Sequence, residues 1–567
     1  MSTRSSSSRA SSGWAPPPNS GDSAPAGGRG CKNDAVTSIV QFDDPTDAPA
    51  TDDQARLNRI REALGDAGFT VDGVEALLGA DVAAALHRDL LVPAIFVLER
   101  DADKNPPLAA LIRLFLLAEP VPFATLPAAD DLLAARILNE PAADGTVTPR
   151  FDIRPYAVAA GDETVELFVA SDLGGLQVSV DQSLRRDHVV GIGPATTNLA
   201  QLTPRQPVST ALDLGVGMGV QTMHLLQHAE RVVATDISER AIEFARFNLL
   251  LNAPALGLDP ANLEARVSLR TGDLLEPVDG EEFDLVVTNP PFVITPRRQG
   301  EEASEQYTYR DGGRPGDRLV EDLIRGLGAH LTPGGIAVML GNWEVHEGDE
   351  TWHSRIETWP GEEADLWVIE REHAEPIEYA DMWLKDAAEN REVDSWREQF
   401  TRYLADFESR SVESIGMGML LLHRPETPGV EAVRRFETLP HQLEQPLGER
   451  IRDTFDADDW LRERSDEDLA DETLVVAGDV TEERWTLPGN PDPSAILLRQ
   501  GGGFRRTFPE STELASFVSV CDGELTARQI LVAIAALLEV DQDALLASVL
   551  ADARTLVSLG FLRPAWM

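Results

Sequence analysis

Cysteine and lysine are both scarce in this chain of 567 residues. Cysteine occurs only as Cys31 and Cys521, and two such distant residues make neither a disulfide framework nor a metal cluster. Lysine occurs only at Lys32, Lys104 and Lys385, so arginine supplies almost all the basic side chains, a bias that we attribute to overall composition. The cysteine usage is typical of a reducing compartment, and we predict a cytoplasmic location.

Long apolar segments are also missing. No stretch approaches the roughly 18 apolar residues that a membrane-spanning helix needs, so we expect no membrane association. Residues 1–50 are rich in Ser, Pro, Gly and Asp, and no apolar segment follows Arg4 and Arg9. This composition predicts a disordered tail rather than a signal peptide. The remaining length predicts several domains, and a hydrophobic content of 43% is enough for normal cores.

Positive charge is in deficit. The chain has 49 basic and 96 acidic residues, which gives a formal net charge of -47. Such acidity favours solubility and repels polyanions at long range, which weighs mildly against an extended nucleic-acid interface. An acidic bias of the source proteome explains the same number and is the interpretation we favour.

A glycine-rich stretch, residues 211–219, reads Ala-Leu-Asp-Leu-Gly-Val-Gly-Met-Gly. Its apolar start predicts a buried parallel strand. The glycines at alternate positions predict a tight turn whose backbone a ligand can approach closely. A helix predicted over residues 220–228 would direct its free N–H groups at that turn. Asp213 stands at the carboxyl end of the strand, the edge where open α/β sheets bind ligands.

Three more predicted strands end at the same edge. Residues 232–235 lead to Asp236, at about the distance where an acid meets a ribose in dinucleotide folds. Residues 267–269 end near Asp273, and residues 283–288 run directly into Asn289. Four strand ends are therefore predicted to converge on one crevice.

The fourth strand is followed by Asn289, Pro290, Pro291 and Phe292. Two consecutive prolines are a poor structural choice here, because they remove backbone donors and force a stiff turn. A rigid turn that merely ends the strand is the plain alternative. The combination with the glycine-rich loop favours a functional motif.

Together these residues resemble the class I S-adenosylmethionine-dependent methyltransferases. The closest likeness is to the N-methylating branch with an Asn-Pro-Pro-Tyr or Asn-Pro-Pro-Phe motif, the "methyltransferase small" type. That branch includes protein glutamine methyltransferases that act on release factors, ribosomal RNA guanine-N2 methyltransferases and DNA adenine-N6 methyltransferases. The resemblance covers about residues 193–343.

The resemblance implies a cofactor and a site. S-adenosyl-L-methionine would be the cofactor, with its amino-acid part near Asp213 and the glycines, its ribose at Asp236 and its adenine amine at Asp273. The implied cofactor-binding set is Asp213, Gly215, Gly217, Gly219, Asp236, Ile237, Asp273, Leu274 and Asn289. Asn289, Pro290, Pro291 and Phe292 would form the catalytic motif. No metal is implied.

Chemistry explains such a motif. An amide or aromatic amine nitrogen is a poor nucleophile because its lone pair is delocalised. The Asn289 side-chain oxygen and the Pro290 carbonyl can each accept one of its hydrogens, while Phe292 stacks on the planar group. No strong base is required, because the rate would come from orientation and from dipoles placed where charge develops.

Three functional hypotheses follow. The leading one is methylation of a protein glutamine amide, as on a release factor, supported by a looser likeness of Tyr309 to Gly313 to the glutamine methyltransferases. Against it, residues 193–198 lack the Arg and Glu that these enzymes tend to carry at that place. The alternative is an exocyclic amine of RNA or DNA. A cofactor-binding scaffold without catalysis is the third hypothesis.

Other features stay ambiguous. Arginines at 297, 298, 310, 314 and 318 suit a phosphate or an acidic protein, but a solvated loop is the favoured interpretation, since acids lie among them. His224 and His228 have a spacing that can ligate zinc, without further ligands nearby. The sequence does not indicate an oligomeric state.

The predicted architecture is an α/β protein with a seven-stranded, mostly parallel Rossmann-like core. We predict a tail at 1–50, an N-terminal helical and β module at 51–185, a catalytic domain at 186–425 and a C-terminal module at 430–567. The N-terminal module is either a winged-helix-like substrate module or a helical cap on the catalytic domain. The C-terminal module should end in three helices, typical of a winged helix.

Overall fold

In a computed structural model of the protein, the described residues are 47–86, 88, 90–161, 163–174, 177, 185–297, 312–386, 393–490 and 492–566. Residues 1–46 of the predicted tail and the Tyr309 to Asp311 part of the looser match lie outside them, as do Arg298 and Arg310. Over residues 47–50 the prediction of a disordered tail is wrong, because Ala48 is buried and the Ala50 N–H donates to the Ala135 carbonyl at 2.9 Å. No helix among the described residues is long and apolar enough to cross a membrane.

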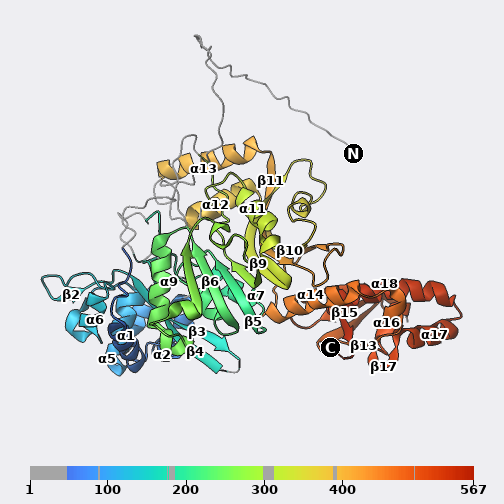
Figure 1. The fold of residues 1–567 in the computed structure, drawn as a ribbon, viewed down its shortest axis with the longest axis horizontal. Coiled ribbons are helices and arrows are strands. Elements are labelled where there is room, and N and C mark those ends of the chain that lie inside the picture. The colour runs from blue at the N-terminus through green and yellow to red at the C-terminus, as the bar shows by residue number, and fades with distance from the viewer. Residues whose placement is uncertain are drawn as a thin grey trace, which may run out of the picture. The chain divides into compact units, whose positions relative to one another are not determined.

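An eight-stranded sheet forms the centre of the fold (Figure 1), in the order β12-β10-β11-β9-β8-β5-β6-β7. β11 is antiparallel to its neighbours β9 and β10, whereas the other pairings are parallel. This is the Rossmann-like methyltransferase arrangement that the sequence predicts. The strands are β5 (Val208–Leu214), β6 (Ala229–Asp236), β7 (Val267–Thr271), β8 (Phe283–Thr288), β9 (Leu331–His346), β10 (Asp365–Ala374), β11 (Val412–His423) and β12 (Arg434–Thr438).

The four strands predicted to end at the ligand-binding edge are confirmed as β5, β6, β7 and β8, and the sheet has eight strands where seven are predicted, with β12 as the additional one. β12 lies beyond the predicted boundary near residues 424–429 but pairs with β10. Its sequence, Arg-Arg-Phe-Glu-Thr, is mostly polar and its residues are half-buried or exposed, as suits an edge strand. The catalytic sheet therefore extends past the boundary that composition suggests.

Helices cover both faces of the sheet. On one face Leu285, Val287 and Val338 pack in a core shared with α9, and Figure 1 shows α9 alongside β6. On the other face Val286 and Met339 pack against α11. The helices of this domain are α7 (Pro194–Leu202), α8 (Val220–Leu225), α9 (Glu239–Leu251), α10 (Ala253–Leu256), α11 (Arg318–Leu327), α12 (Pro376–Asp386) and α13 (Val393–Ser409).

The N-terminal module consists of short helices and an antiparallel hairpin, as predicted. The hairpin strands β3 (Asp152–Ala160) and β4 (Glu163–Ser171) pair along their whole length. The remaining elements are α1 (Gln54–Asp66), α2 (Val71–Leu78), α3 (Ala80–Leu86), α4 (Val92–Asp101), α5 (Pro106–Leu111), α6 (Ala129–Ala134) and the two-residue strands β1 (Val121–Pro122) and β2 (Thr146–Val147).

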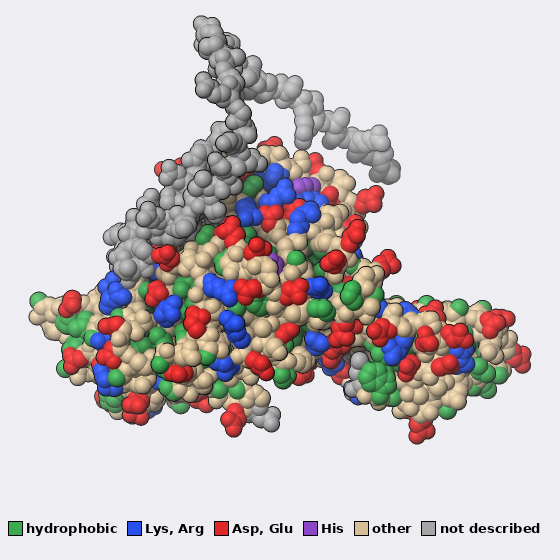
Figure 2. All heavy atoms as spheres, viewed as in Figure 1, with side chains coloured by type: hydrophobic (Ala, Val, Ile, Leu, Met, Phe, Trp, Pro, Cys, Tyr) green, Lys and Arg blue, Asp and Glu red, His purple; other side chains and the backbone are tan. Residues whose placement is uncertain are grey.

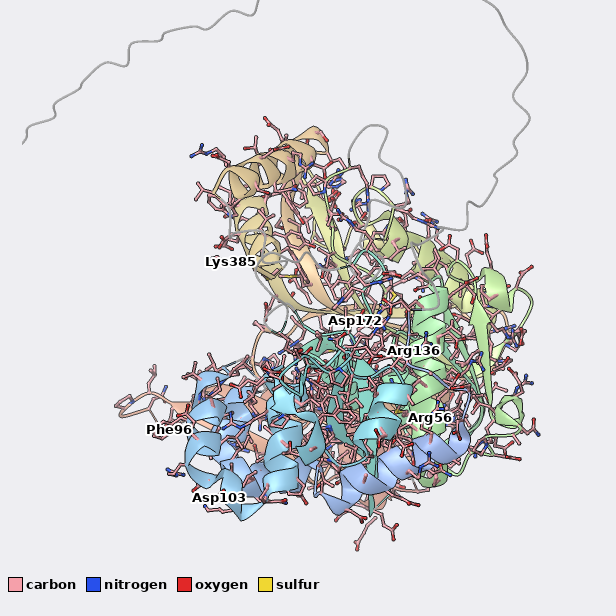
Figure 3. All side chains as sticks on the ribbon, turned by 90° about the vertical axis from the view of Figure 1, so that its left-hand side faces the viewer. Arg56, Phe96, Asp103, Arg136, Asp172 and Lys385 are labelled. Atoms are coloured by element: carbon pink, nitrogen blue, oxygen red, sulfur yellow. The ribbon has the colours of Figure 1, made fainter. Side chains whose placement is uncertain are left out.

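This module shares one hydrophobic core with the catalytic domain. Arg240 of α9, only 1% exposed, makes a bidentate ion pair with Asp172. Asp172 follows β4 and is labelled in Figure 3. Removing one partner of such a buried ion pair strongly destabilises the fold, because the other charge stays buried without compensation. The contacts favour the helical-cap interpretation over a separate substrate module.

The C-terminal module contains the three predicted helices and more strands than predicted. The helices are α14 (Gly448–Arg462), α15 (Asp466–Ala470), α16 (Thr512–Val518), α17 (Ala527–Leu538) and α18 (Gln542–Ser558). One three-stranded sheet comprises β17 (Asp522–Thr526), β13 (Thr473–Val476) and β18 (Leu562–Pro564), and the other comprises β14 (Val480–Thr486), β15 (Pro493–Gln500) and β16 (Thr507–Glu510). The winged-helix-like description stays a prediction.

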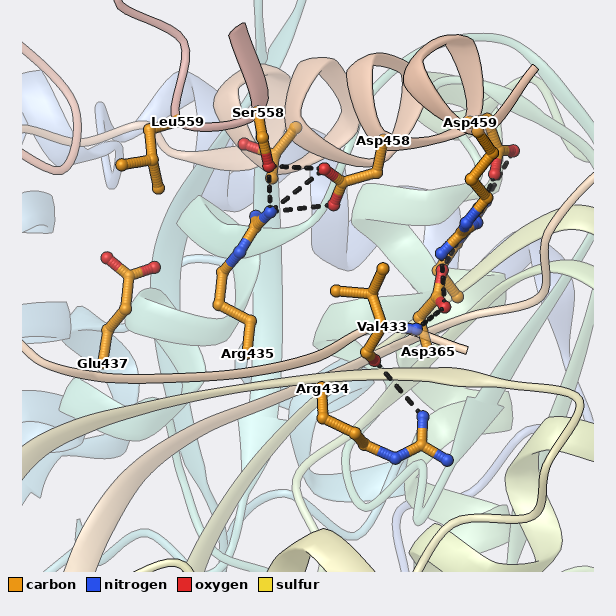
Figure 4. Close-up of polar contacts among 12 residues, drawn as sticks. Asp365, Val433, Arg434, Arg435, Glu437, Asp458, Asp459, Ser558 and Leu559 are labelled. Atoms are coloured by element: carbon orange, nitrogen blue, oxygen red, sulfur yellow. Dashed lines mark hydrogen bonds and ion pairs between the residues drawn. The ribbon is translucent and has the colours of Figure 1, made fainter. Parts of the chain in front are cut away.

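Polar contacts attach this module to β12 (Figure 4). Arg435 of β12 donates to both carboxylate oxygens of Asp458 in α14, at 3.0 and 2.9 Å, and also contacts Ser558 of α18. Arg506 makes a bidentate pair with Glu437 at 2.7 and 2.8 Å. The eighth strand thus serves as the attachment point for the last quarter of the chain.

Candidate active site

The glycine-rich loop joins β5 to α8 at the carboxyl edge of the sheet. Gly215, Gly217 and Gly219 have φ angles of +81°, +53° and +91°, a region that L side chains rarely adopt. A Cβ added at Gly215 or Gly217 would meet nothing within 4 Å, whereas one at Gly219 would lie 3.3 Å from the Ala245 Cβ. Gly219 is therefore explained by packing, and the other two glycines leave their backbone open to a ligand.

Asp213 lies beneath this loop and is 1% exposed. Thr222 of α8 donates a hydrogen bond of 2.6 Å to its carboxylate. Burial raises the pKa of Asp213 to about 7, and the neighbouring charge of Asp236 adds to the effect. Burial makes this carboxyl group costly to ionise, and a cationic ligand group bound beside it would offset that cost.

Asp236 ends β6 and braces the loop. Its two carboxylate oxygens accept hydrogen bonds from the Gly217 N–H at 3.0 Å and the Ser238 N–H at 2.9 Å. Each oxygen keeps a further lone pair that a ribose hydroxyl can use. The next side chain, Ile237, is 39% exposed although it is large and apolar, so it offers a surface to a flat ring.

Asp273 and Leu274 follow β7. Leu274 has a φ of +46°, a left-handed conformation that costs free energy for a branched side chain and is typical of binding sites. The Asp273 carboxylate lies 3.8 Å from the Arg314 guanidinium, which also pairs with Asp322. Of the predicted arginine cluster, Arg314 and Arg318 thus meet acids of this chain, which supports the solvated-loop interpretation.

Asn289 directly follows β8, and its side-chain Oδ1 is the most informative atom of the site. This oxygen is buried and accepts no hydrogen bond from any described residue. Thr288 donates to the Leu214 carbonyl at 2.8 Å, which holds the end of β8 beside the end of β5. A buried acceptor without a donor costs about 1–3 kcal/mol, so its retention points to a ligand that supplies the donor.

The prolines and Phe292 form a tight turn. The Phe292 N–H donates to the Pro290 carbonyl at 2.7 Å, so one lone pair of that carbonyl is used within the motif and the other is free. The Phe292 ring meets Trp383 of α12 edge-on, with centroids 6.5 Å apart. The aromatic ring is thereby fixed in place beside Asn289.

Several residues that support the site were not identified from the sequence. The Tyr379 hydroxyl of α12 accepts from the Ile294 N–H at 2.9 Å and from Asn342 at 2.8 Å, which fixes the chain just after the motif. Asn248 of α9 donates to the Met218 carbonyl within the glycine loop at 2.9 Å. For Asn248, the available sequence signal is an asparagine on the packed face of a helix.

Asn248 and Asn252 also join α9 to the N-terminal hairpin. Asn248 exchanges two hydrogen bonds with the Ala170 backbone, and Asn252 exchanges two with the Phe168 backbone. The two asparagines, one helical turn apart, therefore form with the β4 backbone the hydrogen bonds that a neighbouring strand would form. The cofactor loop and the N-terminal module are coupled through Asn248.

Of the two histidines considered for metal binding, His224 has a hydrogen-bond partner at one ring nitrogen. His224 shares a hydrogen bond of 2.8 Å with the Tyr156 hydroxyl, and burial lowers its pKa to about 3. Among the described residues, Asp365, His423 and Asp459 form the group with metal-like spacing. Arg462 lies among them and donates to Asp365 at 2.5 Å and to Asp459 at 2.6 Å, so an arginine supplies the cation there.

Comparison with known proteins gives two family matches. Residues 190–306 match the methyltransferase small domain, and residues 66–152 match a domain of unknown function, DUF7059. The first match covers the glycine loop and the Asn-Pro-Pro-Phe motif. The second covers most of the N-terminal helical module.

Similar sequences support the first match. The chain is 36% identical over 146 residues to the release factor glutamine methyltransferase of Moorella thermoacetica, covering 25% of this chain and 48% of the relative. It is 33% identical over 140 residues to the ribosomal protein uL3 glutamine methyltransferase of Bradyrhizobium diazoefficiens, covering 24% and 41%. The chain thus spans about half the length of these relatives or less.

Among solved structures, the 16S rRNA N2 G1207 methyltransferase of T. thermophilus is similar at 18% identity and a TM-score of 0.23. The match covers 38% of this chain and 53% of that chain.

Proposed function

We propose that this chain, which contains a class I methyltransferase domain, is an S-adenosylmethionine-dependent methyltransferase that methylates a planar nitrogen, with the side-chain amide of a protein glutamine as acceptor. The observation that carries the proposal is the buried Asn289 Oδ1 without a donor among the described residues. It lies at the carboxyl edge of the sheet, beside the open backbone of Gly215 and Gly217. An N–H group of the methyl-accepting amide that points at this oxygen supplies the missing hydrogen bond.

The residues present fit the cofactor. Gly215 and Gly217 leave room along the backbone, Asp213 offers a carboxylate to a cationic amino group, and Asp236 offers acceptors to ribose hydroxyls. Bound there, S-adenosylmethionine would supply a sulfonium methyl group for transfer to the nitrogen lone pair, with the neutral thioether as the leaving group and the nitrogen proton lost to solvent.

The chain's own residues orient the nitrogen. Asn289 Oδ1 and the second lone pair of the Pro290 carbonyl accept the two N–H groups, which turns the lone pair toward the methyl group. Both acceptors are dipoles fixed by the β8 end and the proline turn, so they need no rearrangement when positive charge develops on nitrogen. Phe292, held by Trp383, covers the plane of the amide.

Two observations support a protein acceptor. Relatives with glutamine methyltransferase names are 36% identical to this chain over 146 residues and 33% identical over 140 residues. The large negative charge of the chain disfavours a polyanion. The exocyclic amine of a nucleobase has the same planar geometry and is the alternative that an experiment must exclude.

The test uses purified protein, methyl-labelled S-adenosylmethionine and an extract of undermethylated cells. Aliquots are then digested with protease or with nuclease. Label that becomes acid-soluble only after protease supports a protein acceptor. Label released only by nuclease refutes the glutamine assignment, and absence of label with folded protein refutes the methyl-transfer function.

A further inference from the structure

A cavity of about 720 Å³ lies over β9 and β11. Its apolar floor comes from Leu340 of β9 and from Met417 and Met419 of β11. Leu340 and Met419 are paired across the sheet. The cavity thus begins on the two strands that follow β8 in the sheet order.

Strand register links this cavity to Asn289. Thr288 pairs with Met339, so Asn289 continues that register by one residue and lies opposite Leu340. Val287 and Val338, two residues earlier on each strand, pack in the same core. Because side chains alternate between faces, Asn289 and Leu340 belong to that same face. Asn289, Leu340 and Met419 therefore form a row that leads from the motif into the cavity.

Apart from Asn198, the walls come from outside the segment that matches the methyltransferase family. A crossover segment, residues 439–447, runs from β12 to α14, and its Gln442 to Gln445 line the cavity. It is held on one side by the hydrogen bond from Leu447 N–H to the Gln201 carbonyl of α7, at 2.8 Å. On the other side Glu444 N–H donates to the Gly503 carbonyl at 2.9 Å, and Arg505 also lines the cavity.

The lining suits a polypeptide. Three side-chain amides, Asn198, Gln442 and Gln445, offer donors and acceptors that match those of a peptide bond. Arg371 donates to the His441 carbonyl at 2.8 Å, while its Nη1 is buried and has no partner among the described residues. A peptide carbonyl satisfies such a donor. Methionines on the floor adapt to varied side chains.

The charge of the lining does not suit a polyanion. Arg371 and Arg505 are matched by Glu372 and Glu444, and Arg505 pairs with Glu444 at 3.2 Å. Figure 2 shows acidic and basic side chains interspersed over the face that it presents. A phosphate backbone requires a row of unmatched cations instead.

We propose that this cavity binds the polypeptide segment that flanks the target glutamine, so that the crossover segment and the C-terminal module form the substrate-binding wall of the enzyme. This inference rests on the proposed function and adds the place where the protein substrate is held. It assigns the last quarter of the chain a role in acceptor selection. It also explains why β12 attaches that module to the catalytic sheet.

The test narrows the cavity from two opposite walls. Gln442 and Asn198 are both exposed, so Gln442→Trp and Asn198→Trp add bulk without disturbing a core. Gln542→Trp is the matched control, since Gln542 is an exposed glutamine at the start of α18, outside the cavity lining. Each variant is tested for thermal stability, for cofactor affinity by calorimetry and for the rate of label transfer into extract protein.

We expect both cavity variants to lower the rate at dilute extract at least about tenfold, equivalent to about 1.4 kcal/mol of acceptor binding. The rate should recover as extract concentration rises, whereas stability and cofactor affinity stay at wild-type values, as do all properties of Gln542→Trp. Equal rates for all variants overturn the cavity assignment and leave the methyl-transfer function standing. Absence of transfer by the wild type overturns both, and nuclease-sensitive label overturns the polypeptide ligand.

Discussion

Replacing Asn289 by alanine should nearly abolish methyl transfer without lowering the stability of the protein. The Asn289 Oδ1 is a buried acceptor without a donor among the described residues. Its removal therefore relieves a desolvation cost of about 1–3 kcal/mol, partly offset by lost packing of the side chain. We expect the free energy of unfolding of Asn289→Ala to stay at the wild-type value or to rise by up to about 2 kcal/mol.

The same substitution should nearly abolish methyl transfer. Loss of one fixed dipole in an active site typically lowers kcat about 100- to 1000-fold. The assay combines denaturant unfolding with initial rates of label transfer, at equal concentrations of folded protein. Opposite directions for stability and rate identify an atom kept for chemistry rather than for the fold.

Asn252→Ala is the matched control. Asn252 is also a buried asparagine, but its amide group exchanges hydrogen bonds with the Phe168 backbone at 2.7 and 2.9 Å. Its removal leaves two buried backbone groups unsatisfied, so we expect a loss of about 3 kcal/mol with kcat retained while the protein is folded. If Asn289→Ala instead loses stability and keeps its rate, the reasoning on Asn289 is refuted.

Two further predictions concern the cofactor loop. Because burial raises the pKa of Asp213 from 3.8 to about 7, the native state holds a proton that the unfolded state has lost in this range. The free energy of unfolding of the wild type should therefore fall relative to that of Asp213→Asn as pH rises from 3.8 to about 7, by up to about 1.4 kcal/mol per pH unit. Denaturant titrations across this range check the sign, and a difference that is independent of pH contradicts it. Gly217→Ala should cost about 1 kcal/mol of stability, because the φ angle at this position is one that L side chains rarely adopt. It should also weaken cofactor binding at least about tenfold in calorimetry, because the added Cβ would occupy the open space that we assign to the cofactor. Gly219→Ala should mainly lower the melting temperature, because its Cβ would lie 3.3 Å from the Ala245 Cβ; equal effects of the two variants on cofactor affinity would argue against the division of roles.

The catalytic core could be predicted because its signals are local. Apolar strands that end in Asp213, Asp236 and Asn289 indicate both a parallel sheet and the edge where it binds ligands. The glycines at 215 and 217 have positive φ angles, so their role depends on their own backbone conformation. Each of these features depends on a few neighbouring residues, so one sequence is sufficient to identify them.

The contacts between modules could not be predicted in the same way. β12 has the polar sequence of an exposed segment, and only its pairing with β10 makes it a strand. Asn248 and Asn252 are polar residues on the packed face of a helix, but the sequence does not show that the β4 backbone is their partner. Arg435 finds Asp458 and Ser558 on helices much further along the chain. Such long-range pairings leave no periodic signal in the sequence.

The acceptor assignment likewise depends on these distant elements. The family match ends at residue 306, before β9, β11 and the crossover segment. The cavity beside Asn289 is built largely from those later residues. The matched segment therefore holds the residues on which the proposed reaction rests, whereas the proposed acceptor site lies mostly in parts of the chain beyond that segment.

The most direct test of the central claim is the chemical form of the transferred label. Protein labelled by the purified enzyme is subjected to complete acid hydrolysis, which cleaves a methylated amide but leaves methylated amino groups intact. Transfer to a glutamine amide predicts that the label appears as volatile methylamine. Label retained in a methylated basic amino acid, or found in a methylated nucleobase, would contradict the account.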